Sequence, residues 1–265
     1  MDIANVEVCS KVASSFIARR IYTFRLYPCL FSLQTFQVRD ASNLDIDTII
    51  QLEVESWTRS MRHPRKQLLN RIESRTCKVF VLEMAGLVVG SILAQRISSL
   101  DAIGEASWSS EDELAQGDGP VLQLLRVNTL VKSSPSCCAG MAVGAILRDF
   151  CLVYARALGI DLVCAVTKTT HFGDKGTQLS YEDYVSEGLA ERFHPDRGLN
   201  FHISKGAKVI EVMPRWRPED EANVGYGVLI AYDLTDEALT PMVLNLQKNT
   251  HAHTVELNAL AALCV

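Results

Sequence analysis

The sequence predicts an α/β (α+β) fold in which helices flank one mixed central sheet of about seven strands. Three observations predict it. Short runs of apolar and β-branched residues recur along most of the chain, segments with helical periodicity separate some of them, and the elements follow the order β, α, α, β, β, β, α, β, α, β, β. This order lacks the regular alternation of strand and helix that a doubly wound dinucleotide-binding fold requires.

The first half of the chain is predicted to hold one strand, two helices and a β-hairpin. Segment 45–57 has apolar residues at positions 46, 49, 50, 52 and 54, the spacing of a helix with one buried stripe. Ala85-Gly86 lies between two apolar runs and indicates a tight hairpin turn. The polar, acidic segment 98–120 interrupts the sheet, and we expect it to loop out. In chain order the elements are a strand at 37–39, helices at 45–57 and 65–75, and strands at 77–84 and 87–97.

The second half ends in a unit of helix, strand, loop and strand. Asp196 is a suitable N-cap for the helix, Leu199 and Ile203 lie one turn apart, and Gly206 is a natural terminator. His202 lies on this helix, where it is either a satisfied structural histidine or a functional one. The elements of this half are a strand at 121–131, a helix at 141–158, a strand at 161–167, a helix or helical turn at 181–191, a short helix at 196–205, and strands at 207–212 and 226–232.

The composition argues against several classes of protein. The 265 residues carry a formal net charge of −5 with a pI near 5.7, whereas a nucleic-acid-binding scaffold usually has a basic face. No apolar run is long enough to cross a bilayer. The eight cysteines include no C-x-x-C pair, which favours reduced thiols over a zinc site or a disulfide framework. We therefore expect a cytoplasmic protein with no bound metal and with neither a nucleic acid nor a membrane as partner.

Three parts are expected along the chain. Residues 1–35 are an N-terminal extension or linker, residues 36–234 are the folded domain, and residues 235–265 are a tail that is mildly helical near its end. Between Lys11 and Gln34 there are four basic residues and no acidic one, a bias that also suits an organelle-targeting presequence. Both interpretations of the extension stay open.

A loop of small residues precedes the helix at 141–158. Small residues at a helix N-terminus let backbone N–H groups approach an anion. With the order of elements, this loop resembles the Q/R-x-x-G-x-G/A loop of the GNAT acyltransferase superfamily, which presents its N–H groups to the coenzyme A pyrophosphate. Gly140 and Ala142 fit that pattern, and Cys137 stands where Gln or Arg is expected. The resemblance implies the GNAT fold, with a V-shaped splay between the fourth and fifth strands. It also implies that coenzyme A is bound by Val131, Cys137, Cys138, Ala139, Gly140, Met141 and Ala142.

Three short motifs follow one another in the closing unit. The chain reads FHISKGA from Phe201, RPED from Arg217 and NVGYGVL from Asn223. These resemble the FHxxHGA, RP-x-D and N-x-GYGVL motifs of the GNAT-like loading domains of polyketide synthases, of the curacin type. Upstream, the segment 165–167 (AVT) resembles the end of their fifth strand, and the segment 55–57 (ESW) resembles the aromatic part of their first helix. The resemblance covers about residues 36–233, and Lys205, in place of the second His, is expected to face solvent.

The resemblance implies a reaction and a set of residues. Domains of this kind remove the carboxylate of malonyl-CoA or methylmalonyl-CoA, and some then pass the acyl group to an acyl carrier protein. At the matching positions Thr167 and His202 become the decarboxylation pair, Trp57 lines the acyl pocket, and Arg217 positions the substrate or the carrier arm. The residue types suit the chemistry. A hydroxyl and an imidazole N–H stabilise the negative charge that develops on the thioester oxygen, and histidine can deliver a proton to carbon. The coenzyme A thioester is the substrate, and no covalently bound cofactor is expected.

Two other functions stay open from the sequence. An ordinary GNAT N-acetyltransferase would acetylate an amine from acetyl-CoA, although that class has a tyrosine where this chain has His202. A non-catalytic acyl-CoA-binding module would suit the substitution at Cys137. Structural explanations also compete with each assignment, because Thr167 can simply end a buried strand, Trp57 can be a core residue and Arg217 a surface cation.

Overall fold

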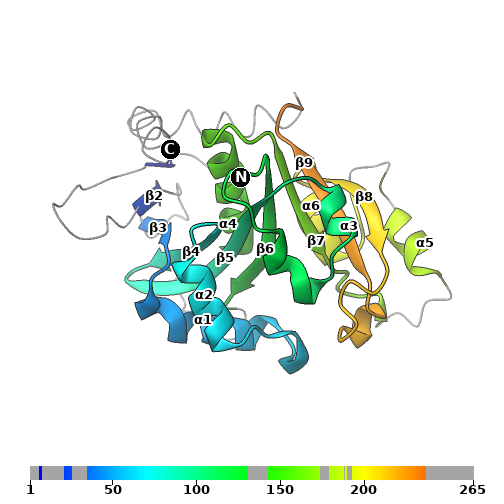
Figure 1. The fold of residues 1–265 in the computed structure, drawn as a ribbon, viewed down its shortest axis with the longest axis horizontal. Coiled ribbons are helices and arrows are strands. Elements are labelled where there is room, and N and C mark those ends of the chain that lie inside the picture. The colour runs from blue at the N-terminus through cyan, green and yellow to red at the C-terminus, as the bar shows by residue number, and fades with distance from the viewer. Residues whose placement is uncertain are drawn as a thin grey trace, which may run out of the picture.

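The chain folds around one mixed β-sheet with helices on both of its faces (Figure 1). This computed structural model describes residues 6–7, 21–25, 35–130, 143–173, 179–187, 189 and 193–236. Among these residues the sheet has nine strands in the order β1-β2-β3-β4-β5-β6-β7-β9-β8. The strands are β1 (Val6–Glu7), β2 (Ile21–Arg25), β3 (Thr35–Asp40), β4 (Cys77–Met84), β5 (Leu87–Ile97), β6 (Val121–Thr129), β7 (Leu162–Thr167), β8 (Lys208–Met213) and β9 (Gly227–Asp233).

The seven strands from β3 to β9 confirm the predicted mixed sheet with flanking helices. Two short strands, β1 and β2, lie within the expected N-terminal extension and continue the sheet beyond β3 by antiparallel pairing. The predicted hairpin is also present, because Met84 pairs with Leu87 across Ala85 and Gly86. Both turn residues have positive φ, 50° and 79°, as a tight hairpin requires.

The strands β6 and β7, fourth and fifth when counted from β3, form the parallel pair of the sheet. Their register runs from Val121 opposite Leu162 to Leu124 opposite Ala165 and stops there. Strand β6 nevertheless continues to Thr129 and β7 to Thr167, so the two strands separate toward their carboxyl ends. This separation is the predicted splay, and it directs the ends of both strands toward the candidate site.

Helices cover the sheet because each has an apolar stripe. On one face, α1 and α2 pack over β4, β5 and β6, with Ile49 and Leu68 fully buried. On the other face, α4 and α6 pack against Val163, Ala165 and other apolar residues of the sheet in the largest core cluster. The helices are α1 (Ile46–Ser56), α2 (Arg65–Glu73), α3 (Asp101–Gly104), α4 (Val143–Ala157), α5 (Tyr181–Ser186) and α6 (Arg197–Ile203), with 3-10 helices at Asn43–Asp45, Arg59–Met61, Trp108–Leu114 and Glu221–Asn223.

The insertion between β5 and β6 was expected to loop out, and that prediction was wrong. Residues 101–114 form α3 and the 3-10 helix η3 (Trp108–Leu114), which fold back over the sheet. Ile103 is fully buried against apolar residues of β7 and β9, and the backbone N–H of Trp108 donates to the carbonyl of Trp216 at 3.1 Å. The segment is acidic, but its Ile103 and Trp108 supply the apolar area that holds it down.

Helix α5 is shorter than the sequence indicated. It ends at Ser186, and Glu187 then takes an extended conformation, whereas the sequence indicated a helix or helical turn over 181–191. Most of the tail proposed at 235–265 lies outside the described residues. In the described part of the chain, no helix has both the length and the apolar character that crossing a membrane requires.

Candidate active site

Helix α6 carries His202, and one carboxylate fixes where that helix begins. Asp196 accepts hydrogen bonds from the backbone N–H groups of Gly198 and Leu199 at 2.8 and 3.1 Å, which confirms it as the N-cap. Its other oxygen accepts from the N–H groups of Thr170 and His171, just beyond β7. Asp196 thereby ties α6 to the end of the strand that carries Thr167.

The start of α6 lies close to the backbone after β7. A Cβ atom at Gly198 would come within 2.5 Å of the carbonyl oxygen of Lys168, so only glycine fits this position. At the other end, Gly206 has φ of 89° and closes the helix as the sequence predicted. The short helix is thus held at both ends, which fixes the position of His202 between them.

His202 is buried, with 7% of its surface exposed, and faces β9. Its Nδ1 lies 2.7 Å from the hydroxyl of Tyr232. Burial, with a contribution from the positive charge of Arg148, lowers the pKa of His202 from 6.5 to about 3, so the imidazole is neutral near neutral pH. Within the part of the chain that the structure describes, Nε2 has no hydrogen-bond partner. One ring nitrogen is therefore held by the protein and the other remains available.

Arg148 links α4 to α6. Its guanidinium donates to the carbonyl of Phe201, lies 4.5 Å over the Phe201 ring and pairs with Asp149. Lys205, expected to face solvent, is half-buried, with its Nζ 3.8 Å from a carboxylate oxygen of the same Asp149. The position of the second family histidine is therefore occupied by a cation that joins α6 to α4.

Thr167 lies on the same face of the sheet as His202 but does not touch it. Alternation along β7 places Thr167 with Val163 and Ala165, which pack toward α4 and α6. Thr167 is half-buried, and its hydroxyl has no hydrogen-bond partner among the described residues. Val163 pairs with Tyr232, the partner of His202, and lies four residues or about 13 Å along β7 from Thr167. The structure thus brings the two proposed catalytic residues to one face of the sheet without a direct contact.

Trp57 ends α1 on the opposite face, where it spans the splay. Its ring N–H donates to the side-chain oxygen of Asn128 on β6 at 2.6 Å. The Nζ of Lys168, which follows β7, lies 4.9 Å from the ring centroid, and the guanidinium of Arg126 on β6 lies 4.3 Å from it. Trp57 is half-buried and contacts groups from both separating strands, which is a suitable place for the wall of a pocket between them.

Arg217 is buried beside the same end of β7. Its Nη2 donates to the carbonyl of Val166 at 2.7 Å, while Nε and Nη1 are buried without a hydrogen-bond partner in the described structure. The motif residues around it build the loop between β8 and β9. The backbone N–H of Gly225 donates to the carbonyl of Asp220, and the side-chain amide of Asn223 donates to the Asp220 carboxylate at 2.9 Å. The interpretation of Arg217 as a surface cation is therefore wrong, since only 3% of it is exposed.

A network of buried charges supports Trp57, and none of its members was singled out from the sequence. Glu53 on α1 accepts from Arg126 and Asn128, both at 3.0 Å. Burial alone would raise the pKa of Glu53, but hydrogen bonding from His63 and the charge of Arg126 outweigh it and lower the pKa. Asn128 in turn accepts the bond from Trp57. Glu53 thus fixes the two β6 side chains that hold the tryptophan ring.

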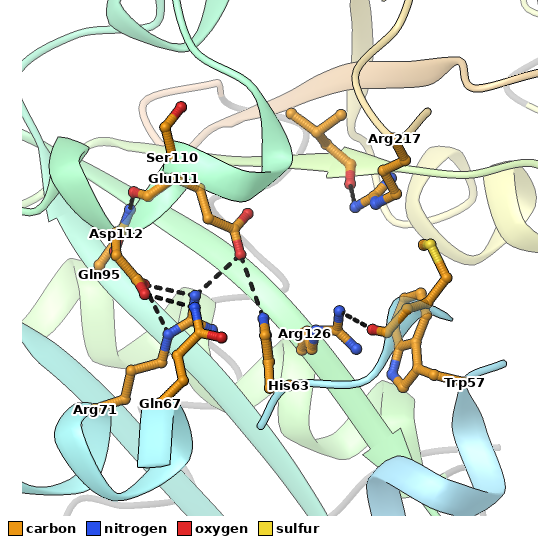
Figure 2. Close-up of polar contacts among 12 residues, drawn as sticks. Trp57, His63, Gln67, Arg71, Gln95, Ser110, Glu111, Asp112, Arg126 and Arg217 are labelled. Carbon is orange, nitrogen blue, oxygen red and sulfur yellow. Dashed lines mark hydrogen bonds and ion pairs between the residues drawn. The ribbon is translucent and has the colours of Figure 1, made fainter. Parts of the chain in front are cut away.

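His63, Arg71 and Glu111 extend this network toward η3 (Figure 2). The Nε2 of His63 lies 3.8 Å from a carboxylate oxygen of Glu111, and Arg71 donates to the same oxygen at 3.1 Å. The His63 ring stacks on Trp108 with 5.9 Å between centroids. Burial raises the pKa of Glu111, which is 2% exposed. The apolar residues of segment 98–120 could have indicated that this segment packs against the sheet. Nothing in the composition of the segment indicated that Glu111 would contact Arg71.

Two further histidines lie near the start of α6, and the sequence left both of them without an assigned role. His194 is structural, because its Nδ1 accepts from the N–H of Asp196 at 2.9 Å and its Nε2 lies 3.0 Å from the carbonyl of Tyr184. His171 is half-buried beside the N-cap of α6.

The residues proposed to bind coenzyme A lie outside the described residues. Those are Val131, Cys137, Cys138, Ala139, Gly140, Met141 and Ala142.

The two buried neutral histidines predict a pH dependence of stability. Burial lowers the pKa of His63 to about 4 and that of His202 to about 3, both from 6.5. Between pH 6.5 and these lowered pKa values, the two histidines bind protons in the unfolded chain but not in the folded one. The folded state therefore has its full stability, as far as these two groups are concerned, above pH 6.5, and it loses stability as the pH falls below that value. We expect the urea midpoint to fall between pH 7.5 and pH 5. His63→Gln should reduce this fall, and an equal midpoint at both pH values would contradict the prediction.

Similarity to known proteins agrees with this geometry. No protein-family model matches the chain. A GNAT-like decarboxylase, GphF, solved in complex with isobutyryl-CoA, is 33% identical, with a TM-score of 0.65 over 74% of this chain and 98% of that one. The loading GNATL domain of CurA from Lyngbya majuscula is 27% identical, with a TM-score of 0.67 over 76% of this chain and 98% of that domain.

A longer curated protein also matches. The probable hydrolase YhcX of Bacillus subtilis (strain 168) is 20% identical over 202 residues, which are 75% of this chain. The chain spans only 39% of the length of YhcX. The similarity to GphF is closer in sequence and covers nearly the whole of that structure. This chain belongs to the family of GNAT-like decarboxylase and loading domains.

Proposed function

We propose that this protein is a decarboxylase of malonyl-CoA or methylmalonyl-CoA. The observation that carries the proposal is the environment of His202, a buried neutral imidazole with one ring nitrogen held by Tyr232 and the other without a partner in the described structure. Thr167 supports it, since its hydroxyl lies on the same face at the end of β7 and has no hydrogen-bond partner among the described residues. The similarity to a GNAT-like decarboxylase supports an enzyme that acts on acyl-CoA.

The proposed reaction breaks the bond between Cα and the carboxylate of the malonyl group. CO₂ leaves, and the electron pair of the broken bond moves into the thioester to form an enolate with its charge on oxygen. The Thr167 hydroxyl and the Nε2–H of His202 donate hydrogen bonds to that oxygen, in the manner of an oxyanion hole. Cα then takes a proton from water, or from Nε2–H with a water molecule returning a hydrogen to Nε2, which gives acetyl-CoA from malonyl-CoA and leaves hydroxide that takes up a proton from solvent.

Tyr232 would set which nitrogen of His202 carries the hydrogen. Burial raises the pKa of Tyr232, so its hydroxyl keeps its proton. The hydrogen bond that the described residues show for this hydroxyl is the one to Nδ1 of His202, at 2.7 Å. If Tyr232 donates to Nδ1, the hydrogen of the neutral imidazole must be on Nε2, and Nε2 then faces the substrate as a donor. Tyr232 is in this view a positioning residue that does not touch the substrate.

The direct test of the function is incubation of the full chain with malonyl-CoA. We expect acetyl-CoA and CO₂ to appear in equal amounts, as measured by mass spectrometry and CO₂ release. Acetyl-CoA with an amine acceptor should give no product. Acetylation of the amine without decarboxylation would instead support the N-acetyltransferase alternative, and no turnover of either kind would contradict both enzymes.

The Tyr232→Phe variant tests the positioning role. Without the hydroxyl, both tautomers of the buried imidazole become populated, and we expect kcat to fall by several-fold to about tenfold with KM nearly unchanged. The imidazole ¹⁵N signals of His202 should report the Nε2–H tautomer in the unmodified protein and a mixture in the variant. Identical ¹⁵N signals in the two proteins would show that Tyr232 does not control the tautomer.

We also propose a context for the reaction. The acyl product serves as a starter unit in polyketide chain initiation and is transferred to the phosphopantetheine thiol of an acyl carrier protein. The domain comprises residues 36–234, between an extension at 1–35 and a tail at 235–265, and acts in the cytoplasm unless the extension directs it to an organelle. Mass spectrometry of a carrier protein after incubation with enzyme and malonyl-CoA tests the transfer, because an acetylated carrier arm adds a defined mass.

A further inference from the structure

Asp196 is a buried carboxylate that uncharged donors satisfy. None of its surface is exposed, and it makes no ion pair among the described residues. Its Oδ1 accepts from the two backbone N–H groups at the start of α6, as described above. Its Oδ2 accepts from the N–H groups of Thr170 and His171 at 2.8 and 2.9 Å. The hydroxyl of Tyr184 on α5 donates to the same Oδ2 at 2.9 Å. One side chain therefore joins α6, the end of β7 and α5.

The saturation of this carboxylate argues against a chemical role. A carboxylate offers about four lone-pair positions, and the two oxygens of Asp196 already accept from five donors. Burial alone would raise the pKa of Asp196, but hydrogen bonds from the backbone N–H groups of His171, Thr170 and Leu199 outweigh it and lower the pKa. The group is thus an anion with no free position for a proton or a substrate, so any effect on the reaction must act through the elements that it joins.

Two of those elements carry the proposed donors to the enolate oxygen. Thr170 lies three residues after Thr167 in the chain. Leu199 lies three residues before His202, which is about 4.5 Å along the helix axis. Asp196 bonds to the backbone N–H groups of Thr170 and Leu199 at once. The carboxylate therefore sets how far α6 lies along the end of β7, and with it the separation of the two proposed donors.

From this arrangement we infer that Asp196 is a positioning residue, which holds the Thr167 hydroxyl and the His202 imidazole at the separation at which both reach the thioester oxygen. The inference rests on the proposed function and adds to it a residue that does not touch the substrate. A misplacement of about 1 Å can cost about 10²-fold in rate. Loss of the bonds to Asp196 should therefore lower kcat and leave KM nearly unchanged, because the proposed coenzyme A contacts are made by other residues.

A close contact sets the same spacing independently of the carboxylate. A Cβ atom at Gly198 would lie 2.5 Å from the carbonyl oxygen of Lys168 and 2.8 Å from the hydroxyl oxygen of Thr170. Gly198→Ala must therefore move the start of α6 away from the end of β7, although the charge and the hydrogen-bonding groups of Asp196 stay in place. We expect this variant to lower kcat by on the order of tenfold.

Asp196→Ser separates helix capping from positioning. Serine is about as good an N-cap as aspartate, so α6 keeps a cap. Its single oxygen on a shorter side chain cannot also accept from Thr170 and His171. We expect kcat for CO₂ release from malonyl-CoA to fall by on the order of 10- to 100-fold, with KM nearly unchanged. Asp196→Asn should give a similar loss, because its NH₂ group would face N–H donors, and urea midpoints show whether each variant is folded.

A double-mutant cycle with Thr167→Val distinguishes positioning from a general loss of structure. When the Thr167 hydroxyl is absent, Asp196→Ser should lower kcat by a further factor of at most about three, whereas a structural defect would lower kcat by the same factor in both backgrounds. Ser74→Ala is the matched control, because the Ser74 hydroxyl oxygen accepts from two backbone N–H groups between α2 and β4. It should reduce stability and leave kcat unchanged.

Two results overturn the inference. One is an original kcat in a folded Asp196→Ser variant, and the other is an equal loss from Asp196→Ser with and without the Thr167 hydroxyl. If Asp196→Ser does not fold, Gly198→Ala decides, and an original kcat in that variant overturns the inference as well. The proposed function is judged separately, by release of CO₂ from malonyl-CoA by the unmodified chain.

Discussion

Replacement of His202 by methionine is expected to lower kcat for malonyl-CoA decarboxylation by about 10²- to 10³-fold. Methionine has a similar bulk but no N–H, so the enolate oxygen loses one of its two proposed donors, and loss of one such donor has this effect in other enzymes. Binding of the thioester should change little, because the proposed coenzyme A contacts are made by other residues. Single-turnover kinetics with quantitation of acetyl-CoA would measure the loss. Thr167→Val removes the other donor and should give a loss of similar size.

Comparison with His202→Gln separates two roles of the imidazole. Glutamine can donate an N–H bond but cannot exchange a proton near neutral pH. If hydrogen bonding to the enolate dominates, His202→Gln should retain more activity than His202→Met. If proton delivery to Cα dominates, both variants should lose activity equally. Activity at the original level in His202→Met, with a urea midpoint that shows a folded protein, would remove His202 from the mechanism.

The Glu53→Gln variant is expected to lower the free energy of unfolding by about 3–5 kcal/mol. Glu53 is 1% exposed and is the carboxylate paired with Arg126, so the neutral amide leaves a buried guanidinium without its counter-charge. The amide NH₂ would also face donors on Arg126, Asn128 or His63 where a carboxylate oxygen accepted hydrogen bonds. Urea unfolding followed by circular dichroism at pH 7.5 measures the change.

Asp47→Asn is the matched control for this prediction. Asp47 lies on the same helix and pairs with Arg65, but the two side chains are 81% and 53% exposed. Exposed ion pairs contribute little, and we expect a change of less than about 0.5 kcal/mol. Equal effects of Glu53→Gln and Asp47→Asn would show that the buried network is not what stabilises this face of the sheet.

Local patterns in the sequence predicted most elements of the fold correctly. The strands at 77–84 and 87–97 have the predicted bounds, and α1 begins and ends within one residue of its prediction. Asp196 and Gly206 terminate α6 because capping depends on residues a few positions apart in the chain. The errors fell on segment 98–120 and on α5, where packing against distant residues decides the outcome.

The sequence by itself determined the order of the elements, the short helix that carries His202 and the motifs that place Arg217 in the loop between β8 and β9. Only the tertiary structure decided that Glu53 pairs with Arg126, that Tyr232 holds His202, and that Arg217 is buried. The physical reason is that a helix cap or a hairpin turn is satisfied by neighbours in the chain. A buried polar or charged group is satisfied by whichever groups the sheet brings near it, and Tyr232 lies 30 positions from His202 while Arg126 lies 73 positions from Glu53.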